Sequence, residues 1–157
     1  MRSWYPPVAG VLVALLLSGC SSIPADPDGT LAQIEQSGEL TVGVAVHPPF
    51  TTVPDGHDED PRGSDIELVR GFAERLGAEP TWVVGGEEEL ITQLEEGEID
   101  LLVGGFTKKH PGLKTVGATR PYGTTEQGGK EVELVMAVVP GENALLTELE
   151  HYLDGVQ

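Results

Sequence analysis

The stretch from residue 85 to residue 107, GGEEELITQLEEGEIDLLVGGFT, constrains the fold of this chain more than any other. Its first half predicts a helix over Glu87–Glu95, because the apolar residues fall on one face at helical spacing and glutamates occupy the other. Its second half, Leu101–Val103, is an apolar run typical of a strand that is covered on both faces of a parallel sheet. Gly104 and Gly105 follow at the strand end, where open α/β sheets hold ligands. The stretch therefore predicts a buried sheet with a ligand site at its edge.

The flanking sequence repeats the alternation of strands and helices. Thr30 and Asp65 are expected to cap helices, and Thr51–Gly63 and Gly123–Lys130 are expected to be exposed polar links. The pattern predicts helices over 31–36, 66–76 and 143–153, and strands over 40–46, 81–84 and 132–139, in addition to those above. Short connections between strands and helices predict an α/β fold, a three-layer lobe with a mostly parallel sheet flanked by helices, over residues 30–157.

The N-terminal segment predicts export from the cytoplasm. Arg2 and the apolar run 8–17 have the order of a signal peptide, which we place at residues 1–19. Residues 17–20, LSGC, resemble the lipobox of bacterial lipoproteins, which implies lipidation of Cys20; the alternative is a plain secretory signal. Residues 20–29 are polar and rich in proline and glycine, which predicts a flexible tether. We therefore expect an extracytoplasmic protein held to the cell membrane by a lipid anchor.

The charge of the chain is strongly negative, at −17 for 26 acidic and 9 basic residues. Nucleic acid and anionic lipid headgroups are therefore poor partners. Between Asp100 and Glu126 no acidic residue occurs, and four basic residues gather there: Lys108, Lys109, Lys114 and Arg120. This basic run is either a solvated loop or a site for an anion or an acidic partner.

The sequence gives no support for an enzyme. It has no Ser/His/Asp order, no phosphate-binding glycine motif and no cysteine other than Cys20. Oxygen and imidazole donors stand together at residues 57–60, but adjacent loop positions do not converge on one metal ion without a folded cage. We expect no catalytic residues, no cofactor and no metal.

Six segments together resemble the solute-binding protein family 3, the receptors of polar amino acid ABC importers. They are residues 38–44, 48–50, 63–68, 94–100, 104–107 and 119–122. The resemblance implies the periplasmic binding protein type II-like fold, in which two lobes close on a solute. Here only residues 123–130 separate Tyr122 from the segment that resembles the family's return strand. The chain therefore resembles the first lobe alone, without the second.

The resemblance also implies where a solute would bind. In the family, an arginine beyond the glycine pair holds the ligand's carboxylate, and Gly112 takes that position when the segments are aligned without gaps. Lys108 and Lys109 are candidates to replace it. The candidate ligand-binding residues are His47, Phe50, Gly104, Gly105, Thr107, Lys108 and Lys109. For three of them a structural role is the alternative: a turn residue for His47, a core residue for Phe50 and a local backbone contact for Thr107.

Two functions follow as hypotheses. The first is a weak receptor or accessory for small polar solutes, anionic or amino acid-like, in ABC-type transport with a membrane transporter as partner. The second is an interaction lipoprotein without a transport role, whose exposed lobe face docks a protein partner or a second copy of itself.

Overall fold

The computed structural model describes residues 26–54 and 59–156. Within these residues, twelve elements follow one another. They are α1 (Thr30–Ser37), β1 (Glu39–Ala45), α2 (Ser64–Leu76), β2 (Glu79–Gly85), α3 (Glu87–Glu95), β3 (Leu101–Val103), the 3-10 helix η2 (Pro111–Lys114), β4 (Gly117–Ala118), β5 (Gly123–Gln127), β6 (Lys130–Leu134), β7 (Ala137–Val138) and α4 (Asn143–Gly155).

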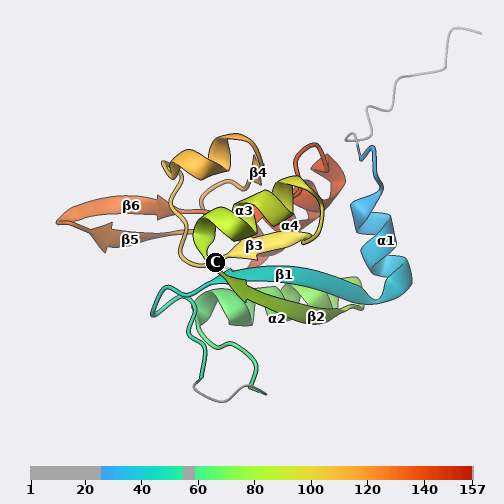
Figure 1. The fold of residues 1–157 in the computed structure, drawn as a ribbon, viewed down its shortest axis with the longest axis horizontal. Helices are drawn as coiled ribbons and strands as arrows, with labels where there is room; N and C mark the ends of the chain where they lie inside the picture. The colour runs from blue at the N-terminus through green and yellow to red at the C-terminus, as the bar shows by residue number, and fades with distance from the viewer. Residues whose placement is uncertain (1–25, 55–58, 157) are drawn as a thin grey trace, which may run out of the picture.

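The main sheet has five strands in the order β2-β1-β3-β7-β4. Strands β2, β1 and β3 run parallel, while β7 runs antiparallel between β3 and β4. The carboxyl ends of β1, β2 and β3 consequently meet at one edge of the sheet, as their arrowheads show in Figure 1. The predicted α/β lobe with a mostly parallel sheet is confirmed.

Helices cover both faces of the sheet and give it two cores. One core joins α1, α2 and α4 to one face, with Phe72 and Leu145 fully buried. The other joins α3 and η2 to the opposite face, around Leu90 and Leu102. Figure 1 shows α2 and α3 on opposite sides of the strands. The continuous apolar run of β3 follows from this arrangement, since both of its faces are covered.

A hairpin replaces the polar link predicted over Gly123–Lys130, and that prediction is wrong. β5 and β6 pair antiparallel around Gly128 and Gly129, whose φ angles are 59° and 74°. Glycine adopts positive φ without steric cost, so two glycines favour a tight turn that matches the twist of a hairpin. The single strand predicted over 132–139 is likewise divided between β6 in the hairpin and β7 in the main sheet.

The two predicted helix caps also differ from the structure. Glycines, Gly29 and Gly63, occupy the N-cap positions of α1 and α2. Thr30 lies inside α1, where its backbone N–H donates to Oε2 of Glu142 at 3.0 Å. Asp65 lies in the first turn of α2, and its carboxylate contacts the loop after β3 instead of its own helix.

The predicted signal peptide, Cys20 and most of the predicted tether lie outside the described residues. Within 26–54 and 59–156, no helix is long and apolar enough to cross a membrane. The last part of the predicted tether contacts the lobe, because the Asp28 backbone N–H donates to Oε1 of Glu142 at 3.1 Å.

Candidate functional site

A hollow of about 270 Å³ opens where β1 and β3 end. Five of the seven predicted ligand-binding residues line it: His47, Gly104, Gly105, Thr107 and Lys109. Five residues that the sequence did not single out complete the wall: Glu87, Phe106, His110, Pro111 and Gln127. The hollow thus lies at the sheet edge that the sequence predicts for a ligand.

The glycine pair is required by packing as well as by backbone conformation. Gly104 and Gly105 have φ angles of 146° and 64°, which residues with a side chain rarely adopt. A Cβ atom at Gly105 would collide with the ring of Phe50, and one at Gly104 with the backbone of Ala45. Phe50 does not line the hollow, so its role is to support the glycine loop from behind. Phe50 is half-buried and lies in neither of the two cores, and its ring packs against Gly105 and His47.

Asp65 holds the glycine loop through its fully buried carboxylate. Oδ2 accepts hydrogen bonds from the backbone N–H groups of Gly104 at 3.3 Å and Gly105 at 2.9 Å. Oδ1 accepts from the hydroxyl of Tyr122 at 2.7 Å. Burial, together with the negative charge of Asp65, raises the pKa of Tyr122 above its ordinary value, so the phenol stays protonated and donates. The two glycine N–H groups are therefore occupied by the protein and are not free for a ligand.

His47 is placed in the wall by a closed turn after β1. Its backbone N–H donates to the hydroxyl of Thr51 at 2.9 Å, and Thr51 is fully buried and donates in turn to the carbonyl of Ala45. The imidazole of His47 meets the ring of Phe50 edge-on, with 5.8 Å between centroids. His47 is thus both a turn residue and a lining residue.

His110 and Glu87 form a polar pair in the wall that the sequence did not indicate. His110 Nδ1 accepts a hydrogen bond from the Gly112 backbone N–H at 3.2 Å. The proton of the neutral ring is therefore on Nε2, which lies 3.1 Å from Oε2 of Glu87 and donates to it. The one signal in the sequence is His110 directly before Pro111, the order of an N-cap residue and the first residue of a helix.

Gly112 does not face the hollow. A Cβ atom there would meet the side chain of Ile91 in the core between α3 and η2. Two other residues of this loop, Lys109 and His110, present charged or titratable groups to the hollow.

The four basic residues of the predicted basic run do not form one surface. Lys109 lines the hollow, but Lys108 Nζ turns to Oε2 of Glu133 at 3.4 Å. Arg120 is held by two acids of α4, Glu150 at 3.0 Å and Asp154 at 2.8 Å. Of the two predicted replacements for an arginine, the structure places Lys109 at the site and directs Lys108 toward β6.

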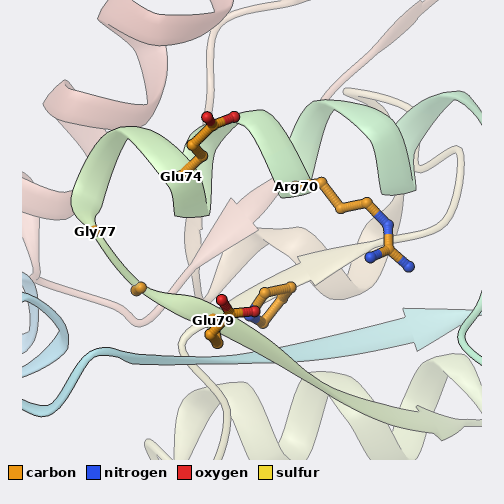
Figure 2. A pocket seen from close by; sticks show the side chains of 6 residues that line it. Arg70, Glu74, Gly77 and Glu79 are labelled. Carbon is orange, nitrogen blue, oxygen red and sulfur yellow. The ribbon is translucent and has the colours of Figure 1, made fainter.

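A second hollow, of about 510 Å³, lies beside the start of β2. Figure 2 shows that the side chains of Arg70, Glu74 and Glu79 around it do not converge on a common point. Arg70 is already engaged, by Asp60 at 2.9 Å and by the ring of Trp82, whose centroid is 5.4 Å away. The one cation among the described residues around this hollow is therefore engaged by the fold, and the hollow at the strand ends remains the candidate site.

The loop donors at residues 57–60 give no metal cage in the part of the chain that the structure describes. Glu59 pairs with Arg62 at 2.8 Å and Asp60 pairs with Arg70, while residues 57 and 58 lie outside the described residues. Among described side chains, no group of three or more metal-binding residues gathers.

Comparison with known proteins gives a consistent picture. Residues 40–151 match the family of bacterial extracellular solute-binding proteins, family 3. The membrane-bound lytic murein transglycosylase F of Vibrio cholerae is 34% identical over 116 residues, which are 71% of this chain and 20% of that protein. A probable histidine-binding protein of Campylobacter jejuni is 26% identical over 108 residues, 69% of this chain and 41% of that protein. This chain thus spans about a fifth of the transglycosylase.

Among solved structures, the arginine-bound form of domain 1 from TmArgBP has a TM-score of 0.69 and 29% identity. The match covers 78% of this chain and 97% of that one. The similarity therefore extends over nearly the whole of an isolated domain.

Proposed function

Because this chain belongs to the bacterial extracellular solute-binding proteins, family 3, we propose that its single lobe binds a small amino acid-like solute outside the cytoplasm. The observation that carries the proposal is the meeting of His47, Gly104, Gly105, Thr107 and Lys109 around one hollow at the strand ends. These residues come from two distant segments of the chain, the turn after β1 and the loop after β3.

The charges around the hollow suit a zwitterion. Lys109 provides a cation for the carboxylate of an amino acid, and Glu87 provides an anion for its ammonium group. A lysine is a flexible point charge, and a single lobe leaves much of the ligand in solvent. We therefore expect a dissociation constant of roughly 0.1–1 mM, well above that of a two-lobed receptor.

Two relatives support an amino acid as the solute. One is named as a probable histidine-binding protein. The other is a domain 1 whose structure is described as arginine-bound, which supports binding by one lobe. Both ligands carry an α-carboxylate, an α-ammonium group and a polar side chain, so the proposed solute class is a polar amino acid.

We place the protein at the membrane through lipidation of Cys20, with a membrane transporter as its partner. The family description supports an extracellular location. The transglycosylase relatives give no reason to propose an enzyme, because the match covers only a fifth of their length and most of this chain matches the solute-binding family. We propose a binding role without catalysis.

Isothermal titration calorimetry with the twenty amino acids on residues 26–157 tests the function. We expect at least one polar amino acid to bind, and Lys109→Ala to weaken it about fivefold through loss of the charge pair. Lys108→Ala is the matched control, because the neighbouring lysine pairs with Glu133 away from the hollow, and its affinity should stay within about twofold of wild type. Absence of binding at millimolar concentration of every amino acid would refute the function.

A second candidate is docking of a protein partner at the same edge. Val46, just after β1, and Val84, near the end of β2, are 54% and 48% exposed. A contiguous apolar patch marks a contact surface, and in this second proposal the two valines belong to such a patch. Sedimentation of the purified domain at several concentrations distinguishes a self-associating protein from a monomeric receptor.

A further inference from the structure

Gln127 belongs to the wall of the hollow although it lies on the hairpin, far along the chain from the other lining segments. It is the last residue of β5, directly before the turn at Gly128 and Gly129. The same hollow is lined by His47 after β1 and by the loop after β3. Figure 1 shows the hairpin projecting past the edge at which these strands end.

The base of the hairpin is fixed to the site loop by backbone hydrogen bonds. The Lys108 N–H donates to the carbonyl of Glu133 at 3.0 Å, and the Val135 N–H donates to the carbonyl of Phe106 at 2.9 Å. Thr107 forms a further antiparallel bridge with Leu134. The base of the hairpin is therefore fixed to the loop after β3, which borders the hollow. This loop sets the direction in which the hairpin projects.

The strand alternation places Gln127 on the inner face of the hairpin. Thr125, opposite Val132, and Gly123, opposite Leu134, share this face with Gln127, and they are less exposed than their neighbours. Thr124 and Glu126 lie on the other face and are exposed to solvent. The Gln127 side chain is itself exposed, so its amide has hydrogen-bonding capacity to offer a ligand.

We propose that the β5–β6 hairpin is a second wall of the solute site, and that the side-chain amide of Gln127 hydrogen-bonds the bound solute. This inference rests on the proposed function and adds a specificity-determining residue to it. A glutamine amide donates and accepts at once, so it recognises polar groups of a solute without selecting for charge. The hairpin in this way supplies one contact in addition to those from the loops after β1 and β3.

NMR with ¹⁵N-labelled protein tests the contact directly, with L-arginine and L-histidine as probes. The Gln127→Ala variant identifies the side-chain NH₂ signals of Gln127 by their disappearance. We expect these signals to shift during titration together with the backbone signals of Thr107 and Lys109. Affinity should fall about three- to tenfold in Gln127→Ala, as expected for one lost hydrogen bond. Glu126→Ala, on the outer face, is the control and should bind like wild type.

The outcomes separate the two proposals. Shifts at Thr107 and Lys109 without a shift of the Gln127 side-chain signals, or equal affinities of Gln127→Ala and Glu126→Ala, would overturn the hairpin wall and leave the proposed function standing. If neither probe shifts any of these signals, the function fails for these solutes and the hairpin contact fails with it.

Discussion

Asp65 shows how one buried carboxylate sets the geometry of a binding loop. It joins the start of α2 to the glycine pair after β3 and to Tyr122 before β5. Within the described residues no ion pair involves Asp65, so hydrogen-bond donors and the N-terminal end of α2 stabilise its charge. The site loop therefore depends on a residue that a ligand does not need to touch.

We predict that Asp65→Ala lowers the free energy of unfolding by about 3 kcal/mol, because it leaves buried donors at Gly104, Gly105 and Tyr122 without an acceptor. Tyr122→Phe removes one donor only and should cost about 1 kcal/mol. Urea denaturation followed by circular dichroism measures both. Equal losses in the two variants would show that the glycine contacts contribute nothing.

At the scale of elements, Glu142 connects the beginning of the lobe to its last helix. Its side chain is buried, and it accepts the backbone N–H groups of Asp28 and Thr30, so that it caps α1 from the start of α4. Burial and a hydrogen bond with Glu142 raise the pKa of Asp26 from 3.8 to about 6. Burial acts against ionisation of Glu142 too, but hydrogen bonds from Asp26 and the α1 backbone outweigh it and lower its pKa.

This pair predicts a pH-dependent contribution to stability. The folded-state pKa of Asp26 lies above its ordinary value, so its contribution is complete below about pH 4 and is lost as pH rises through about 6. Asp26→Asn keeps a hydrogen-bond donor to Glu142 without a proton to lose. We expect the variant to exceed wild type by about 1 kcal/mol at pH 7 in urea denaturation.

The difference between Asp26→Asn and wild type should shrink toward zero near pH 4, where Asp26 is protonated. Comparing the two proteins at each pH cancels the opposite contribution of Glu142, which is lost as pH falls. A stability difference between the two proteins that does not change between pH 4 and pH 7 would contradict the hydrogen bond from protonated Asp26 to Glu142.

The elements that the sequence predicted well are those with a one-sided or continuous apolar pattern. The bounds of α3 agree with the prediction to the residue, and β3 begins at the predicted Leu101, because amphipathic periodicity and a buried run report directly on packing. The hairpin was missed because Thr124, Glu126 and Glu131 face solvent, and a polar hairpin carries no apolar alternation beyond Val132. Its two glycines are the remaining signal, and adjacent glycines fit a polar loop as well as a hairpin turn.

The candidate site was predicted in part for the same reason. Gly104, Gly105 and Lys109 follow a recognisable strand, so their place at its end could be expected. The contributions of Glu87 and Gln127 depend on how α3 and the hairpin lie against that strand, which is a property of tertiary packing. The local sequence pattern around Glu87 and Gln127 does not indicate this packing.

At the scale of the whole molecule, attachment to the membrane depends on the proposed lipidation of Cys20. Acyl chains contribute about 0.8 kcal/mol per buried methylene, so two or more chains hold a protein stably. We predict that Cys20→Ala moves the protein from the membrane fraction to the soluble fraction of the expressing bacterium, measured by fractionation and immunoblotting. Ser21→Ala is the control and should stay with the membrane. A Cys20→Ala protein that remains in the membrane fraction would refute the anchor.

The turn at Gly128 and Gly129 has a practical consequence. Two adjacent strands leave the lobe and return at neighbouring points, so any inserted domain whose own termini lie close together fits there without stretching the host. A circularly permuted fluorescent protein placed between these glycines would sit at the end of the strand that carries Gln127. The lobe would then serve as the sensing half of an optical reporter for amino acids.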